Sequence, residues 1–146
     1  MGLLERLRGG SARVGIYVDG PNVFRSEFDV DLDDLRAIAR GEGVVAVSRV
    51  YVDENASAGL IQAAEARGFE VATTSGDVDV RLAVDAVEAT AAGRLDTLVV
   101  VSRDTDFKPV VETAAKRGVR TVAVAPGQHG RSDALRNAAN AEITLE

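Results

Sequence analysis

Four aspartates of the sequence stand where apolar runs end or helix-like segments begin. They are Asp19, Asp79, Asp104 and Asp106. Carboxylates gathered in this way repel one another, and a charge at the end of a core strand is costly unless a cation meets it. Mg²⁺ and Mn²⁺ prefer carboxylate oxygens and retained waters. The pattern therefore predicts a divalent metal site with these four side chains as ligands.

Helix capping is the competing interpretation for part of this set. The segment 31–34 carries three aspartates that are expected to cap the first helix and to interact with its dipole. Asp79 and Asp106 each lie just before or within a first helical turn, so capping alone would explain them. Asp19 is harder to explain in this way, because it ends the apolar run "VGIYV" and is followed by a Gly-Pro turn.

Three further polar residues are candidates for supporting roles. Asn22 offers an amide from the loop that follows Asp19, and Ser102 is expected to anchor the loop before Asp104 by hydrogen bonding. Asp85 lies six residues after Asp79, roughly a turn and a half along a helix. We interpret Asp85 as a polar residue of the core or of the surroundings of the site, with metal ligation as the alternative.

The elements that must position these residues alternate regularly. Apolar runs predict strands, and apolar residues at helical spacing predict helices between them. Strands are expected at 13–18, 44–52, 69–74, 97–102 and 120–125, and helices at 32–41, 56–68, 78–93, 107–118 and 132–140, before a short terminal "EITLE". Strands that are apolar throughout belong to a parallel sheet covered on both faces, so the expected class is a three-layer α/β sandwich. Helix ends are expected at Gly41, Gly68, Gly93 and Gly118.

This architecture brings the candidate residues together. In open parallel sheets, ligands bind beyond the carboxyl ends of the strands. Asp19 follows the first strand, Asp79 follows the third, and Asp104 and Asp106 follow the fourth. The loops that carry them are therefore expected to meet along one edge of the sheet.

Composition sets the limits on the class of protein. The chain has 146 residues, 46% hydrophobic and 27% charged, which favours one folded domain over 13–146 after a short lead at 1–12. A net charge of −6 argues against a broad basic surface for nucleic acid, so any such binding must be local. Cysteine is absent, no apolar stretch approaches the length of a membrane span, and "MGLLERLRGG" is unlike a secretory signal. We expect a cytoplasmic protein without membrane association.

Three segments resemble the signature motifs of a known family. "YVDGPNV", "DVDVRLAVDA" and "VVVSRDTDFKPVVETAAKRG" are similar to the motifs of the NYN domain family, part of the PIN-like nuclease superfamily. The tail "RSDALRNAANAEITLE" is similar to the closing segment of its LabA-like or DUF88 group. The resemblance implies a PIN-like fold with sheet order 3-2-1-4-5 and an acidic Mg²⁺ or Mn²⁺ site that hydrolyses RNA. Matching positions are Asp19, Asn22, Asp79, Asp104 and Asp106.

The resemblance predicts a metal-dependent endoribonuclease with RNA as its partner. Basic residues near the edge of the sheet are candidates for RNA contacts, with solvated surface positions as the alternative for each. They are Arg25, Arg81, Arg103, Lys108 and Arg131. Because PIN-like proteins commonly pair, a homodimer that builds a longer groove is also considered.

Other functions share the fold class and an acidic edge. A receiver domain would place its acceptor Asp at the end of the third strand and a Lys before the Pro after the fifth, where this chain has "TTSGD" and Ala125. A haloacid-dehalogenase-type phosphatase requires Asp-x-Asp after the first strand, and "DGPN" lacks the second Asp. The more serious alternative is a non-catalytic PIN-like module that binds RNA or a protein and keeps the metal site.

Overall fold

The computed structural model describes residues 12–25, 30–127 and 132–145. Strands and helices alternate along most of the chain, as the apolar pattern predicts. The strands are β1 (Arg13–Asp19), β2 (Val44–Asp53), β3 (Glu70–Thr74), β4 (Thr97–Val101), β5 (Arg120–Ala125) and β6 (Ala141–Thr144). The helices are α2 (Gly20–Val23), α3 (Leu32–Glu42), α4 (Ala58–Ala66), α5 (Val78–Ala91), the 3-10 helix η1 (Thr105–Phe107), α6 (Lys108–Lys116) and α7 (Asp133–Ala138).

All six strands form one parallel sheet in the order β3-β2-β1-β4-β5-β6. The expected order of the first five strands and the short C-terminal strand are both confirmed. β1 lies between β2 and β4, with Asp19 opposite Tyr51 of β2 and Val18 opposite Val101 of β4. The last residues of these central strands consequently meet at one edge of the sheet. Within the described residues, no helix is long and apolar enough to cross a membrane.

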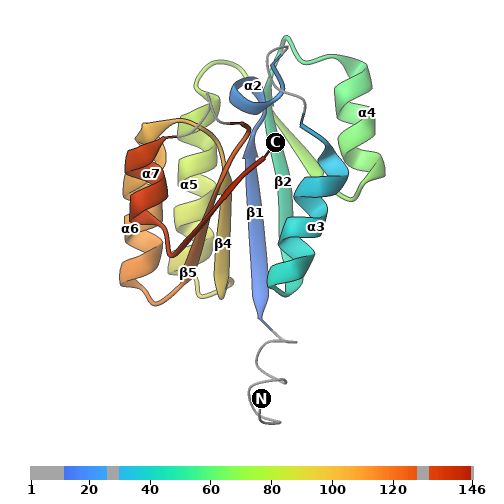
Figure 1. Cartoon of the computed structure of the whole chain (residues 1–146). Coiled ribbons are helices and arrows are strands. Elements are labelled where there is room, and N and C mark those ends of the chain that lie inside the picture. The colour runs from blue at the N-terminus through green and yellow to red at the C-terminus, as the bar shows by residue number, and fades with distance from the viewer. Residues whose placement is uncertain (1–11, 26–29, 128–131, 146) are drawn as a thin grey trace.

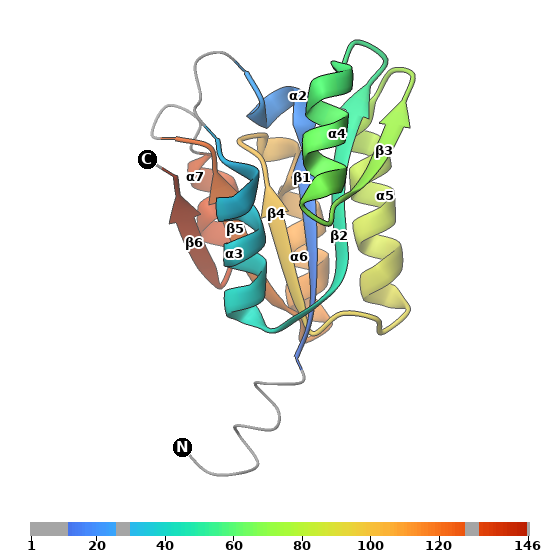
Figure 2. The same cartoon turned by 90° about the vertical axis from the view of Figure 1, so that its right-hand side faces the viewer.

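Helices cover both faces of the sheet and create two hydrophobic cores. Figure 1 shows α5, α6 and α7 on one side of the strands and α3 with α4 on the other. Figure 2 shows the same division, with α3 and α4 in front of the sheet. β1 serves both cores because its side chains alternate: Ile16 and Val18 face the α3 side, and Tyr17 faces the α5 side. The three-layer α/β sandwich is therefore confirmed.

Several local boundaries differ from those that the sequence indicates. α3 continues through Gly41 and ends at Glu42, so the helix end expected at Gly41 is wrong by one residue. The other three glycines follow their helices in the left-handed region, with φ values of 90°, 71° and 80° at Gly68, Gly93 and Gly118. After Asp19 the chain forms the one-turn helix α2, closed by a hydrogen bond from Phe24 N to Gly20 O (2.8 Å). Asp31 caps α3 as expected, accepting from Asp33 N at 2.8 Å.

Candidate metal centre

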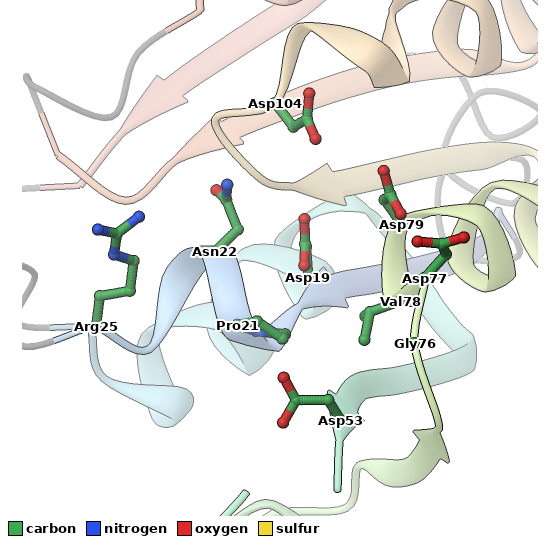
Figure 3. A pocket seen from close by; sticks show the side chains of 10 residues that line it. All are labelled: Asp19, Pro21, Asn22, Arg25, Asp53, Gly76, Asp77, Val78, Asp79 and Asp104. Carbon is green, nitrogen blue, oxygen red and sulfur yellow. The ribbon is translucent and has the colours of Figure 1, made fainter. Parts of the chain in front are cut away.

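An acidic pocket lies at the carboxyl ends of the central strands. Its volume is about 310 Å³, and it is formed by the ends of β1 and β2, the helix α2, the start of α5 and the loop after β4. Figure 3 shows Asp19, Asp79 and Asp104 directing their carboxylates into a common space. The lining residues are Asp19, Pro21, Asn22, Arg25, Asp53, Gly76, Asp77, Val78, Asp79 and Asp104.

Asp19 forms the buried floor of this pocket. It is the last residue of β1, and only 4% of its surface is exposed. Burial raises the pKa of its carboxyl to about 6, and the nearby charges of Asp104 and Asp79 raise it as well, against the opposing hydrogen bond from Ser102. The folded chain therefore stabilises the charged form of Asp19 less than water stabilises an exposed carboxylate.

Ser102 and Asn22 connect the floor of the pocket to the loop that carries Asp104. The Ser102 hydroxyl lies 3.2 Å from Asp19 Oδ2 as a donor and accepts from the backbone N–H of Asp104 at 3.0 Å. Asn22 Oδ1 accepts from the backbone N–H of Arg103 at 2.9 Å. Ser102 thus makes the anchoring hydrogen bonds that the sequence predicts. Asn22 of α2, just after β1, holds the same loop.

Asp79, Asp104 and Asp106 form a cluster with the spacing of metal ligands. One carboxylate oxygen from each lies within 4.8 Å of the others. Asp104 also caps the 3-10 helix η1, because its Oδ1 accepts from the backbone N–H of Asp106 at 2.9 Å. Asp106 is therefore not the cap of the following helix, which begins at Lys108 without a side-chain cap.

The four aspartates have no salt-bridge partner among the described residues, although Arg25 lines the same pocket. No Arg or Lys among the described residues forms an ion pair with Asp19, Asp79, Asp104 or Asp106. The available donors are carboxylate oxygens together with the Asn22 amide. This set fits a hard divalent cation, which binds oxygen ligands and keeps several waters.

Asp85 lies on the same helix as Asp79 but has other partners. It accepts from the Tyr51 hydroxyl at 2.7 Å and pairs with Arg49 at 3.2 Å and with Arg81 at 3.1 Å. Burial raises the pKa of the Tyr51 hydroxyl, and its hydrogen bond to Asp85 raises the pKa further. Asp85 is partly buried, and it belongs neither to the pocket lining nor to the cluster of three aspartates.

The basic residues chosen as RNA contacts occupy different places. Arg25 lines the acidic pocket, and Lys108 is exposed at the start of α6. Arg81 pairs with Asp85, and Arg103 donates its backbone N–H to Asn22. Arg131 lies outside the described residues.

Two pocket residues escaped the sequence interpretation. Asp53 ends β2 just as Asp19 ends β1, and it enters the pocket from that strand. Its signal was available, because it directly follows the apolar run "VYV". Asp77 also lines the pocket, as the residue before α5, where its side chain makes no capping hydrogen bond.

A comparison with protein families assigns the chain. The model of the NYN domain matches residues 13–146, which is most of the chain. The chain belongs to the NYN domain family. NYN domains are a PIN-like nuclease family, and this one has a cluster of three aspartates that could bind a divalent metal.

Two similar proteins place this NYN domain among relatives. It is 39% identical over 140 residues to the uncharacterized protein MJ0482 of Methanocaldococcus jannaschii, covering 96% of this chain and 58% of that protein. The chain thus spans little more than half the length of this relative. The crystal structure of VPA0982, a protein of unknown function from Vibrio parahaemolyticus, has the same fold, with a TM-score of 0.81, 22% identity and 94% coverage of both chains.

Proposed function

We propose that this NYN domain is a metal-dependent ribonuclease of the LabA-like group that hydrolyses RNA phosphodiester bonds in the acidic pocket. The observation that carries the proposal is the convergence of Asp79, Asp104 and Asp106, with ligand atoms within 4.8 Å of one another, beside the buried Asp19. The family supports a nuclease rather than another use of an acidic pocket. Mg²⁺ or Mn²⁺ is the proposed ion, because all the clustered donors are oxygens.

The four aspartates and the two residues that position them have distinct parts in this proposal. Asp19, Asp79, Asp104 and Asp106 hold the ion directly or through water. A bound divalent ion lowers the pKa of a water and neutralises charge that develops on the phosphate. Asn22 and Ser102 keep Asp104 and Asp19 in fixed relative positions through the hydrogen bonds at the end of β4. Preorganisation of this kind limits the rearrangement needed when substrate binds.

RNA contacts outside the ion are proposed for basic residues near the pocket. Arg25 is the first candidate, since it lines the pocket itself. Lys108, Arg103 and Arg131 are proposed as contacts to neighbouring phosphates. Arg81 is a weaker candidate, because Asp85 already pairs with it at 3.1 Å. A homodimer and a cytoplasmic location remain part of the proposal.

The direct test is RNA cleavage by the purified protein. Single-stranded and hairpin RNAs are incubated with Mn²⁺ or Mg²⁺, with a chelator, and with the Asp104→Asn variant. Cleavage should require the ion and should fall by more than about 100-fold in the variant. Asp34→Asn is the matched control, because it removes an exposed carboxylate of α3 outside the pocket.

Two results would contradict the proposal. Cleavage that persists in chelator and in Asp104→Asn would exclude a metal-dependent reaction in this pocket. RNA binding without cleavage, over many substrates and at several salt concentrations, would favour the non-catalytic binding module. Salt must be varied because phosphate contacts weaken steeply as its concentration rises.

A further inference from the structure

A second pocket adjoins the acidic one. It has a volume of about 250 Å³, and it shares two lining residues, Pro21 and Asp53, with the acidic pocket. Its remaining wall is mixed: Val52 of β2, Leu60 of α4 and Phe24 after α2 are apolar, and Asn55 and Ser57 are polar. The acidic pocket suits an ion and a phosphate. The second pocket suits a flat group with an apolar face that belongs to the same ligand molecule as the phosphate.

Phe24 is the feature that distinguishes this second pocket. The chain has four Phe, two Tyr and no Trp. Of those that the structure describes, Phe24 is partly exposed, whereas Tyr17, Tyr51, Phe69 and Phe107 are each 3% exposed or less. Burial in the core explains those four rings. Phe24 packs against the core on the α3 side, but it is only partly buried and also lines the second pocket.

The position of Phe24 is fixed by its backbone. Its N–H donates to Gly20 O at 2.8 Å, which closes the single turn of α2. A Cβ on Gly20 would collide with the carbonyl oxygen of Tyr51, so glycine allows α2 to lie directly against β2. The backbone of Phe24 is therefore held beside the end of β2, and its side chain lines the second pocket together with Leu60 of α4.

The opposite wall of the pocket is also held in place before any ligand arrives. Asp53 Oδ1 accepts from the backbone N–H of Asn55 at 2.9 Å, and Ser57 Oγ accepts from Leu60 N at 3.1 Å. These bonds order the loop between β2 and α4. The exposed Asn55 side chain, which can both donate and accept, stands at the edge of this wall.

We infer that the second pocket binds one unpaired nucleobase of the RNA, stacked on Phe24, beside the phosphate held in the acidic pocket. Proteins that recognise single-stranded RNA stack splayed bases on aromatic rings and contact the base edges with polar side chains. The inference rests on the proposed function and adds a base-binding subsite to it. A base that stacks on Phe24 must be unpaired, because a paired base cannot leave its helix without cost.

Binding of a short single-stranded RNA tests this inference. Fluorescence anisotropy is measured with Ca²⁺ in place of Mn²⁺, for the wild type, Phe24→Leu, Phe24→Ala and the control Val84→Ala, whose side chain is exposed on α5 away from both pockets. Phe24→Leu keeps an apolar side chain and removes the aromatic face. We expect its dissociation constant to rise about 5- to 100-fold, with Mn²⁺ affinity and thermal unfolding close to wild type.

An RNA with one abasic nucleotide supplies the second arm. Scanning the abasic position along the RNA should reveal one position that weakens binding to the wild type and has little further effect on Phe24→Leu. Wild-type cleavage combined with unchanged binding by Phe24→Leu would overturn the base pocket and leave the nuclease standing. RNA binding that depends on Phe24 but is not followed by cleavage would support the base pocket and overturn the nuclease. A wild type that neither binds nor cleaves RNA would overturn both the base pocket and the nuclease.

Discussion

Asp79 and Asp85 lie on the same helix, yet their carboxylates have opposite surroundings. Asp85 meets two arginines and a tyrosine hydroxyl, so its charge is compensated by the chain. Asp79 instead faces Asp104 and Asp106, and no described cation pairs with any of them. The first arrangement is satisfied by groups of the chain, whereas the second presents carboxylate oxygens that a cation could bind. Compensation by the chain, rather than the presence of acidic residues, separates a structural carboxylate from a candidate ligand.

The different surroundings of Asp79 and Asp85 predict different effects of their substitution on metal affinity. Asp79→Asn and Asp104→Asn should each lower the affinity for Mn²⁺ by more than about 100-fold, because each removes a ligand oxygen and a negative charge. Asp85→Asn should change the affinity by less than about threefold. Isothermal titration calorimetry measures all three. Equal losses in Asp79→Asn and Asp85→Asn would show that the two carboxylates do not differ as their partners indicate.

Substitution of Asp85 should lower the stability of the fold instead of the metal affinity. Asp85→Ala leaves Arg49 and the Tyr51 hydroxyl without their shared acceptor, so the free energy of unfolding should fall by about 3 kcal/mol. Urea unfolding in the absence of metal measures the change. Asp34→Asn, which alters an exposed carboxylate, should stay within about 0.5 kcal/mol of wild type. A similarly small change for Asp85→Ala would mean that its ion pairs contribute nothing.

Removing the charge of Asp19, by contrast, should raise the free energy of unfolding. Since burial raises the pKa of Asp19 from 3.8 to about 6, folding favours its protonated form. The corresponding stability is fully present below about pH 4 and is lost as the pH rises through 6. In chelator at about pH 8, Asp19→Asn should therefore be more stable than wild type by about 2 kcal/mol, and this advantage should disappear near pH 4.

Mn²⁺ provides the control for this Asp19 experiment. Saturating ion should stabilise the wild type and leave Asp19→Asn nearly unchanged, reversing their order at about pH 8. Urea unfolding at several pH values, with and without ion, measures both effects. A variant that is less stable than wild type in chelator would contradict the view that Asp19 is held at a cost.

The smallest expected effect concerns the hydroxyl that connects two candidate ligands. Ser102→Ala removes the donor to Asp19 and the acceptor for Asp104 N, so Mn²⁺ affinity should fall by about 10-fold. Ser48→Ala is the matched control, because its buried hydroxyl has no hydrogen-bond partner in the described structure. Calorimetry on both variants distinguishes positioning from a general effect of losing a hydroxyl, and an unchanged affinity in Ser102→Ala would remove the positioning role.

The architecture could be predicted because its signals are local and repeated. Apolar runs identified the buried strands, and helical spacing identified the intervening helices, so the three-layer class was available from the sequence. The strand order came from the resemblance to NYN domains, since periodicity does not determine which strands are neighbours. The end of α3 was missed by one residue because Gly41 is tolerated inside the exposed last turn.

The candidate site was predicted in outline and differs in its contacts. Residues after strands were expected at one edge, but Asp53 was overlooked although it follows β2 as Asp19 follows β1. Asp106 was considered as a helix cap from the sequence, but in the structure Asp104 is the cap, because its Oδ1 accepts from Asp106 N. The partners of Asp85 could not be predicted from the sequence. Arg49 and Tyr51 lie more than 30 positions away from it, and only the folded sheet brings them into contact with it.

The shared wall of the two pockets has a consequence for how this domain can diversify. The proposed ion ligands come from β1, α5 and the loop after β4, whereas the base pocket draws heavily on the segment 52–60. Exchanging the loop 54–57 between NYN domains would therefore change base preference while the ligand residues stay in place. An exchanged loop must remain compatible with Asp53 and Pro21, because these two residues line both pockets.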